Sequence, residues 1–210
     1  MITKEDTVLE LFPIPILITK YSGTIEEEFK FIHNLEYIGK KSDKGNFRTK
    51  NTYLLRYKEL SKIKDFIYEN LNKFTTELLQ TKQKVIITQS WCNKNPTNTD
   101  HSIHHHPNSI ISGVFYFKQN PTLPPIQFSK VPGQSFMFKI EKRNNFNSAI
   151  SMFPMVDGEL ILFPSDLWHS VPLNQGKDTR YSMSFNTFAN ELGSEENLTE
   201  LKLQELNVND

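Results

Sequence analysis

The chain has 210 residues, and its 24 basic and 24 acidic side chains cancel to a formal net charge of zero. This balance, with only four arginines, argues against a protein that holds nucleic acid by bulk positive charge. The single cysteine, Cys92, excludes an intramolecular disulfide and any site built from several cysteines. No apolar stretch is long enough to cross a bilayer and no signal-peptide pattern follows Met1, so we expect one soluble, cytoplasmic domain.

Residues 1–83 are expected to form a strand and a helical layer. Residues 12–21 carry two prolines, which favour a strand at the edge of a sheet. Thr24 is placed to cap a short helix whose first turn contains Glu26–Glu28. The clearest helix is predicted at Lys58–Gln80, because apolar residues recur there at three- and four-residue steps.

Residues 84–190 change to a period of two, which is typical of strands. Short β-rich runs alternate with clusters of Pro, Gly and Asn, a spacing that favours a sandwich or barrel. We therefore predict a mainly β fold, a jelly roll with N-terminal helices packed on one sheet. Residues 191–210 are a polar tail, expected to be a weak helix or disordered. The expected strands are Lys84–Trp91, Ile110–Phe117, Ile126–Ser129, Ser135–Ile140, Glu159–Phe163, Trp168–Val171 and Thr179–Thr187.

Four of the six histidines lie between residues 101 and 106, which suggests either a metal site or a solvated loop. In an extended chain, residues i and i+2 share a face about 6.6 Å apart, so His104 and His106 can share one ion. His105 must then point the other way. His101 is expected in the preceding loop, and His33, on the N-terminal helix, is expected to be structural or exposed.

A third imidazole could come from His169, which follows the apolar run Glu159–Pro164 and a turn. Taken alone, a histidine at a strand end is more often a structural residue than a metal ligand. Together with His104 and His106, however, it would complete a set of three nitrogen ligands on neighbouring strands.

The last strand, Thr179–Thr187, alternates between an apolar face and a polar face. The polar face could be a solvent-exposed edge. It could also be the wall of an anion-binding cavity, because Arg180 can hold a carboxylate with two hydrogen bonds and serine hydroxyls such as that of Ser182 add donors. The strand that contains Ser112 and Tyr116 places a hydroxyl and a phenol on one face in the same way.

Together these segments resemble the iron(II)- and 2-oxoglutarate-dependent oxygenase superfamily, whose core is a double-stranded β-helix. More narrowly, they are similar to 2OG-Fe(II) oxygenases of marine bacteria and phages, which would place a phage-encoded protein in the host cytoplasm. The resemblance covers about residues 85–188. Its motifs, in chain order, are Ser90-Trp91, His104-His105-His106-Pro107-Asn108-Ser109, Ser112-Gly113-Val114-Phe115-Tyr116, Phe163-Pro164-Ser165 with His169, and Arg180-Tyr181-Ser182.

The resemblance implies Fe(II) as the metal and 2-oxoglutarate as a small-molecule cosubstrate. It implies His104, His106 and His169 as the metal ligands. Arg180 would bind the far carboxylate of 2-oxoglutarate, helped by the residues Tyr116, Ser112, Ser182 and Asn93. The metal-bearing strands would lie in one sheet and the strands of Tyr116 and Arg180 side by side in the facing sheet. Trp91 is expected in the core.

One position departs from the usual superfamily pattern His-x-(Asp/Glu). His106 stands where a carboxylate is usual, so the ligand set would leave Fe(II) with a net charge of +2 instead of +1. Asp100 is the nearest carboxylate, but no strand geometry directs it to the site.

The expected activity is hydroxylation of an unidentified substrate, by analogy a peptide or amino acid, with decarboxylation of 2-oxoglutarate to succinate. Two alternatives remain open: a three-histidine dioxygenase of cupin type that does not use 2-oxoglutarate, and a non-enzymatic jelly-roll binding module. Neither a nucleic acid nor a membrane is expected as a partner.

Overall fold

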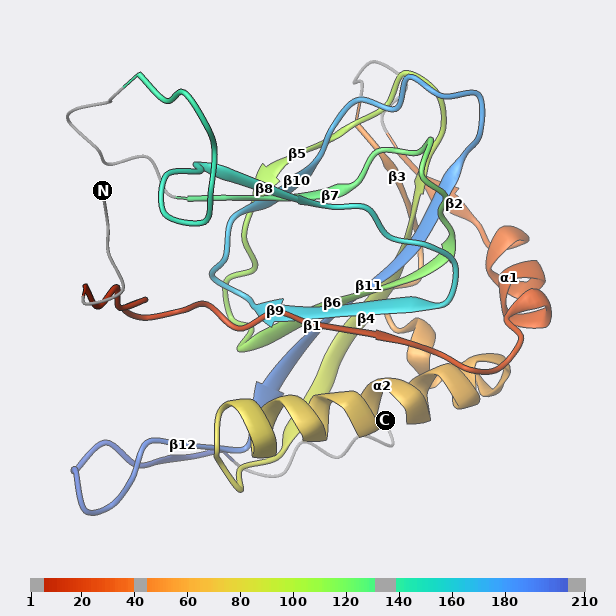
Figure 1. Cartoon of the computed structure of the whole chain (residues 1–210). Helices are drawn as coiled ribbons and strands as arrows, with labels where there is room; N and C mark the ends of the chain where they lie inside the picture. Colours follow the sequence, from red (N-terminus) through yellow and green to blue (C-terminus); the bar gives the residue numbers. More distant parts are fainter. Residues whose placement is uncertain (1–5, 40–44, 131–138, 204–210) are drawn as a thin grey trace.

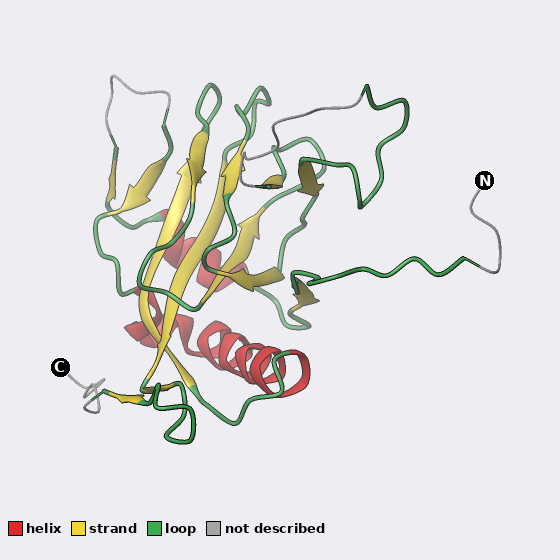
Figure 2. Ribbon diagram, turned by 90° about the vertical axis from the view of Figure 1, so that its left-hand side faces the viewer, coloured by secondary structure: helices red, strands yellow, loops and turns green. Residues whose placement is uncertain are grey.

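The computed structural model describes residues 6–39, 45–130 and 139–203. Two antiparallel sheets face each other, and helices cover the outer face of the larger sheet (Figure 1). In Figure 2, the N-terminal segment leaves the sheets as an extended loop. The helices are α1 (Glu26–His33) and α2 (Ser61–Lys73); short 3₁₀ turns at Leu54–Arg56 and Lys58–Leu60 precede α2, and a π-helical turn at Phe74–Leu78 follows it.

Among the described residues, the larger sheet has seven strands and the smaller sheet has four. In spatial order the larger sheet consists of β1 (Leu17–Lys20), β9 (Glu159–Pro164), β6 (Ile111–Lys118), β11 (Arg180–Ala189), β4 (Val85–Asn95), β3 (Phe47–Thr49) and β2 (Tyr37–Ile38). The smaller sheet consists of β5 (His101–His104), β10 (His169–Val171), β7 (Ile126–Ser129) and β8 (Ile150–Phe153). This two-sheet arrangement confirms the predicted jelly roll.

The larger sheet buries apolar side chains on both faces. On the outer face, Tyr181, Met183 and Phe185 of β11 pack in one cluster with α2 residues such as Ile67. On the inner face, a second cluster fills part of the space between the sheets, with Val114, Tyr116, Ile126, Phe128, Met155, Ile161 and Phe163. The rest of that space is bordered by polar side chains of β4 and β11, and it contains the candidate site.

The N-terminal predictions are confirmed in outline and corrected in detail. The edge strand exists as β1, but only Leu17–Lys20 pair with β9. Thr24 is not the cap of α1, because Ile25 occupies the N-cap position and makes no side-chain capping hydrogen bond. The helix predicted at Lys58–Gln80 begins with a 3₁₀ turn and changes to a π-helical turn at Phe74.

Several strand boundaries also differ from the prediction. β4 continues to Asn95, and the short strands β2, β3 and β8 were not expected. Of the strand predicted at Ser135–Ile140, residues 135–138 lie outside the described residues, and residues 139 and 140 are not in a strand. In the tail, β12 (Glu191–Leu192) pairs with β13 (Leu201–Lys202), so the described part is not helical. None of the helices in the described parts of the chain combines the length and the apolar character needed to span a membrane.

Candidate metal centre and anion site

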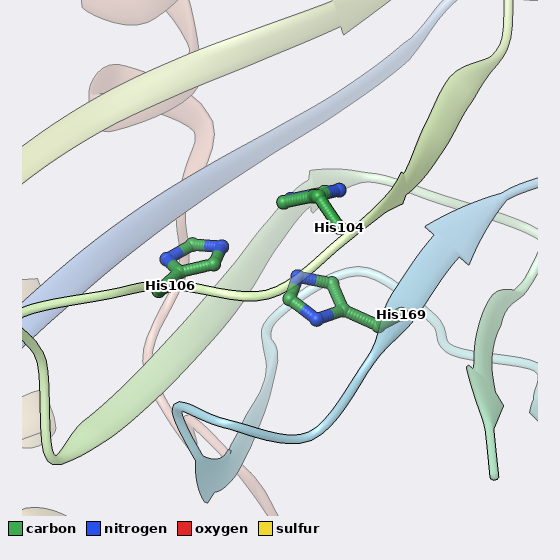
Figure 3. Close-up of side chains that lie close together, drawn as sticks. All are labelled: His104, His106 and His169. Carbon is green, nitrogen blue, oxygen red and sulfur yellow. The ribbon is translucent and has the colours of Figure 1, made fainter. Parts of the chain in front are cut away.

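Three histidines from the smaller sheet and its loops meet between the sheets. His104 ends β5, His169 begins β10 directly opposite it, and His106 lies two residues beyond β5. One ring nitrogen of each lies within 4.8 Å of the others. Figure 3 shows the three rings turned toward a common space. The structure therefore brings together the three residues that the sequence proposed as metal ligands.

Each of these rings is fixed by a hydrogen bond from its Nδ1. His104 Nδ1 donates to the carbonyl oxygen of Ser102 at 2.7 Å, and His169 Nδ1 donates to that of Leu167 at 2.9 Å. His106 Nδ1 donates to the side-chain oxygen of Asn186. Because a carbonyl or amide oxygen only accepts, each Nδ1 carries the proton. Each Nε2 is then an unprotonated nitrogen with a lone pair, the form that binds a metal.

The protonation of the three rings also suits a metal. Burial lowers the pKa of His104 and of His106, and it lowers the pKa of His169 to about 3. All three are therefore neutral near pH 7. Three neutral imidazoles fit a divalent transition metal such as Fe(II) or Zn(II).

No carboxylate joins this group among the described residues. Asp100 is outside it, and the backbone of Asp100 bridges to Gly45 instead. His105 points away, and its ring lies 4.6 Å from that of Trp168. His33 is exposed and contacts Phe29 and Tyr181 on the other side of the larger sheet.

A chain of hydrogen bonds supports His106 from the larger sheet. The Asn186 oxygen that accepts from His106 also accepts from the Ser112 hydroxyl at 3.1 Å. Ser112 in turn contacts the Ser165 hydroxyl at 2.8 Å, and Ser165 donates to Ser109 at 2.7 Å. Ser112, proposed from the resemblance as a cosubstrate contact, therefore lies at the histidine end of the space between the two sheets.

Trp91 also belongs to the histidine end. Its ring stacks on that of His106, with centroids 5.8 Å apart and planes 24° apart. It is only half-buried, so the expectation that it lies in the core is wrong. The side chain lies on the same face of β4 as Asn93, and that face borders the cavity.

The other end of the cavity is built around Arg180, whose side chain is 2% exposed. Its Nη1 donates to the Ser182 hydroxyl at 2.9 Å and to the Asn95 side-chain oxygen at 3.2 Å. Its guanidinium carbon lies 5.1 Å from the centre of the Tyr116 ring. β4, β11 and β6 are adjacent, so Asn95, Arg180, Ser182 and Tyr116 line one continuous wall.

This wall contains buried polar atoms without partners. Within the described residues no carboxylate pairs with Arg180, and Arg180 Nε, Asn95 Nδ2 and the Tyr116 hydroxyl have no hydrogen-bond partner. Burial raises the pKa of Tyr116, which keeps the phenol neutral and able to donate. A buried charge and buried donors without partners each cost free energy. The wall is therefore suited to an anionic ligand that accepts hydrogen bonds.

Asn93 lies between the two ends. It sits opposite Ser182, donates to the Ser184 hydroxyl at 2.9 Å, and accepts from the Asn46 amide at 2.7 Å. The alternation of β4 would also have pointed to Asn95, but the predicted strand stopped at Trp91. Asn186 stands on the polar face of β11 that the sequence identified, but nothing in the sequence indicated its bond to His106.

Comparison with known proteins agrees with this geometry. The model of a family described as "Putative 2OG-Fe(II) oxygenase" matches residues 89–186, a segment that contains every proposed site residue. No curated protein sequence matches the chain.

Solved structures share the fold at low identity. An oxidoreductase of the 2OG-Fe(II) oxygenase family from Burkholderia pseudomallei is 10% identical, with a TM-score of 0.59, and the match covers 82% of this chain and 83% of that one. HygX from Streptomyces hygroscopicus, with nickel, 2-oxoglutarate and hygromycin B bound, is 11% identical, with a TM-score of 0.59 and coverage of 83% and 82%. The epimerase SnoN from nogalamycin biosynthesis is 9% identical, with a TM-score of 0.61 and coverage of 85% and 80%.

These likenesses show the fold, and the family match covers the site. They do not bear on the marine bacterial or phage branch, which stays a prediction. Residues 89–186, the β core of this chain, match the model of the 2OG-Fe(II) oxygenases, a family of non-haem iron enzymes that use 2-oxoglutarate.

Proposed function

We propose that this protein couples the oxidative decarboxylation of 2-oxoglutarate to the hydroxylation of a C–H bond. In this reaction O₂, 2-oxoglutarate and the substrate give succinate, CO₂ and the hydroxylated product. One oxygen atom of O₂ enters succinate, and the other enters the product. The two electrons that the keto acid loses and the two that the C–H bond loses reduce O₂.

The metal would be held by His104, His106 and His169 through their Nε2 atoms. Three protein ligands leave further coordination positions open for the cosubstrate and O₂. Bound Fe(II) supplies the activation of O₂. The protein's part is to keep the three rings neutral and correctly turned, which the Nδ1 hydrogen bonds to Ser102, Leu167 and Asn186 support.

The cosubstrate would be held by the wall around Arg180. The observation that carries this proposal is the buried guanidinium of Arg180, which has no acidic partner among the described residues and stands on the sheet that faces the strands of the three histidines. Arg180 would bind the far carboxylate, and the unpartnered Tyr116 hydroxyl and Asn95 amide would complete its hydrogen bonds. A three-histidine dioxygenase without a keto acid would leave this wall without a ligand, and so would a binding module.

The primary substrate would enter along a groove beside the smaller sheet. A groove of about 840 Å³ runs there between residues 9–16 and strands β7 and β8, and it reaches Trp168, next to His169. Its volume is in the range of small-molecule sites, and its lining is mainly apolar. A peptide or amino-acid substrate remains the preferred class. Two proteins of similar fold bind larger natural products in their structures: HygX binds hygromycin B and SnoN binds nogalamycin RO.

The proposal is tested by anaerobic titration calorimetry of 2-oxoglutarate against the Mn(II)-loaded protein, followed by assays of O₂ uptake and succinate release with Fe(II). We expect saturable binding that requires the metal, and succinate in proportion to the O₂ consumed. If the metal-loaded protein does not bind 2-oxoglutarate, or if it consumes O₂ without releasing succinate, the cupin-type alternative is favoured.

A further inference from the structure

His101 is a strand residue beside the three proposed ligands, although its position in the sequence predicts a loop residue. It is the first residue of β5 and pairs with Val171, while His104 pairs with His169. Two residues of β5, Ser102 and Ile103, thus stand opposite one residue of β10, which is a bulge. Both intervening residues are exposed. The bulge therefore places His101 and His104 on the same side of the strand, facing the larger sheet.

The His101 ring is in contact with the metal centre without belonging to it. It stacks on the His104 ring with centroids 4.3 Å apart and planes 26° apart. Its nitrogens are not part of the closely spaced ligand group. Whereas the three proposed ligands each donate from Nδ1 to a protein oxygen, no hydrogen bond fixes the His101 ring among the described residues. Both of its nitrogens are left for a ligand.

The path of the chain places the same ring at the arginine end. β4 ends at Asn95, which pairs with Arg180 at the start of β11, and residues 96–100 then lead directly to His101. In the loop that follows β10, the side-chain amide of Asn174 donates to the carbonyl oxygen of Asn95 at 3.0 Å, so this end of β5 and β10 is tied to the end of the larger sheet that carries Arg180. His101 therefore lies between His104, on which it stacks, and the arginine end.

From this geometry we infer that His101 is a cosubstrate-binding residue, which donates a hydrogen bond from the smaller sheet to the carboxylate that Arg180 holds from the larger sheet. This inference rests on the proposed function, because it takes 2-oxoglutarate as the ligand. Arg180 supplies the charge, and His101 adds a hydrogen-bond donor from the facing sheet. The carboxylate would then be bound from both sheets.

The test uses the Mn(II)-loaded full-length protein and two keto acids. 2-Oxobutyrate has the same metal-binding end as 2-oxoglutarate but no far carboxylate. His101→Phe keeps a ring that can stack on His104 but has no donor. We expect it to weaken 2-oxoglutarate binding by about tenfold or more, the typical effect of a lost hydrogen bond to a charged group, and to leave 2-oxobutyrate and Mn(II) binding unchanged.

Two further variants complete the design. His101→Gln keeps a donor and should recover part of the 2-oxoglutarate affinity, while His105→Phe, next to the site but turned toward Trp168, should change no affinity. Equal losses for both keto acids, or a loss of Mn(II) affinity in His101→Phe, would overturn the inference and give His101 a role in supporting His104. If wild-type protein binds 2-oxoglutarate and His101→Phe binds it equally well, the inference fails and the proposed function stands. If wild-type protein does not bind it, the proposed function itself fails.

Discussion

The two ends of the cavity differ in how completely the protein satisfies its own polar groups. At the histidine end, every Nδ1 of the three proposed ligands donates to a protein oxygen. At the arginine end, Arg180 Nε, Asn95 Nδ2 and the Tyr116 hydroxyl are buried without partners. The histidine end is thus arranged without a metal, whereas the arginine end would be completed by the proposed ligand. We therefore expect the two ends to respond to substitution independently.

The largest expected effect is at the histidine end. Substituting a residue that only supports a metal ligand typically lowers metal affinity by up to ~100-fold. Replacing His104, His106 or His169 itself by Ala should lower iron affinity by more than that. Metal content and titration calorimetry with Fe(II) under anaerobic conditions measure this. The matched control is His106→Asp, which restores the usual carboxylate and should keep the metal. Wild-type affinity in all three Ala variants would refute the ligand assignment.

The arginine end should behave in the opposite way. Arg180→Met should weaken 2-oxoglutarate binding by a factor of about 30 or more, because truncating one partner of a buried charge pair costs about 2–5 kcal/mol. Metal affinity should not change. Arg180→Lys keeps the charge but not the planar group, and it should also bind 2-oxoglutarate less tightly than wild type.

The same variant also tests whether the guanidinium is unsatisfied in the absence of ligand. Removing a buried charge that has no acidic partner among the described residues should stabilise the ligand-free protein, and about 1 kcal/mol would raise Tm by roughly 2–4 °C. 2-Oxoglutarate should raise the Tm of wild type and not that of Arg180→Met. A lower Tm for ligand-free Arg180→Met would mean that the guanidinium has a stabilising role of its own.

A smaller effect is expected from the support of His106. Asn186→Leu removes the acceptor of His106 Nδ1 and frees the ring to change tautomer, so metal affinity should fall by about 10–100-fold. Asn186→Asp keeps an acceptor and serves as the control. The ratio of metal affinities in these two variants is the measurement, and equal affinities would show that the hydrogen bond does not orient the ring.

The smallest effect concerns pH. Burial lowers the pKa of His169 to about 3 in the folded protein, whereas an unfolded histidine titrates near 6.5. Below about pH 6.5 the unfolded chain takes up protons that the folded, metal-free protein does not. Its free energy of unfolding should therefore fall as pH decreases from about 6.5 to 3. Urea unfolding at several pH values measures this, and His169→Gln should show a weaker dependence between pH 6.5 and 5.

The sequence predicted those parts of the site that follow from strand alternation. The polar face of β11 and the shared side of His104 and His106 are both consequences of a two-residue period, although His106 lies just beyond β5. The position of His101 could not be read in this way, because a bulge reverses the alternation and depends on pairing with β10. The bond between Asn186 and His106 joins residues 80 positions apart, so only the folded chain reveals it.

The fold was predictable to a similar extent. Long runs with periodic apolar residues predicted α2 and the central strands. In these elements one or both faces are buried, so the apolar residues recur at regular steps. The two-residue strand β2, the three-residue strand β3 and the mostly exposed strand β8 carry too few apolar positions to show a period. They form because a neighbouring strand supplies hydrogen bonds.

The most direct test of the central claim is a crystal structure of the full-length protein with Mn(II) and 2-oxoglutarate, in which anomalous scattering locates the metal. The account predicts Mn(II) bound by Nε2 of His104, His106 and His169, and the far carboxylate of 2-oxoglutarate on Arg180 beside Tyr116. A metal bound by Asp100 or His105, or a keto acid that leaves Arg180 without a carboxylate, would contradict it.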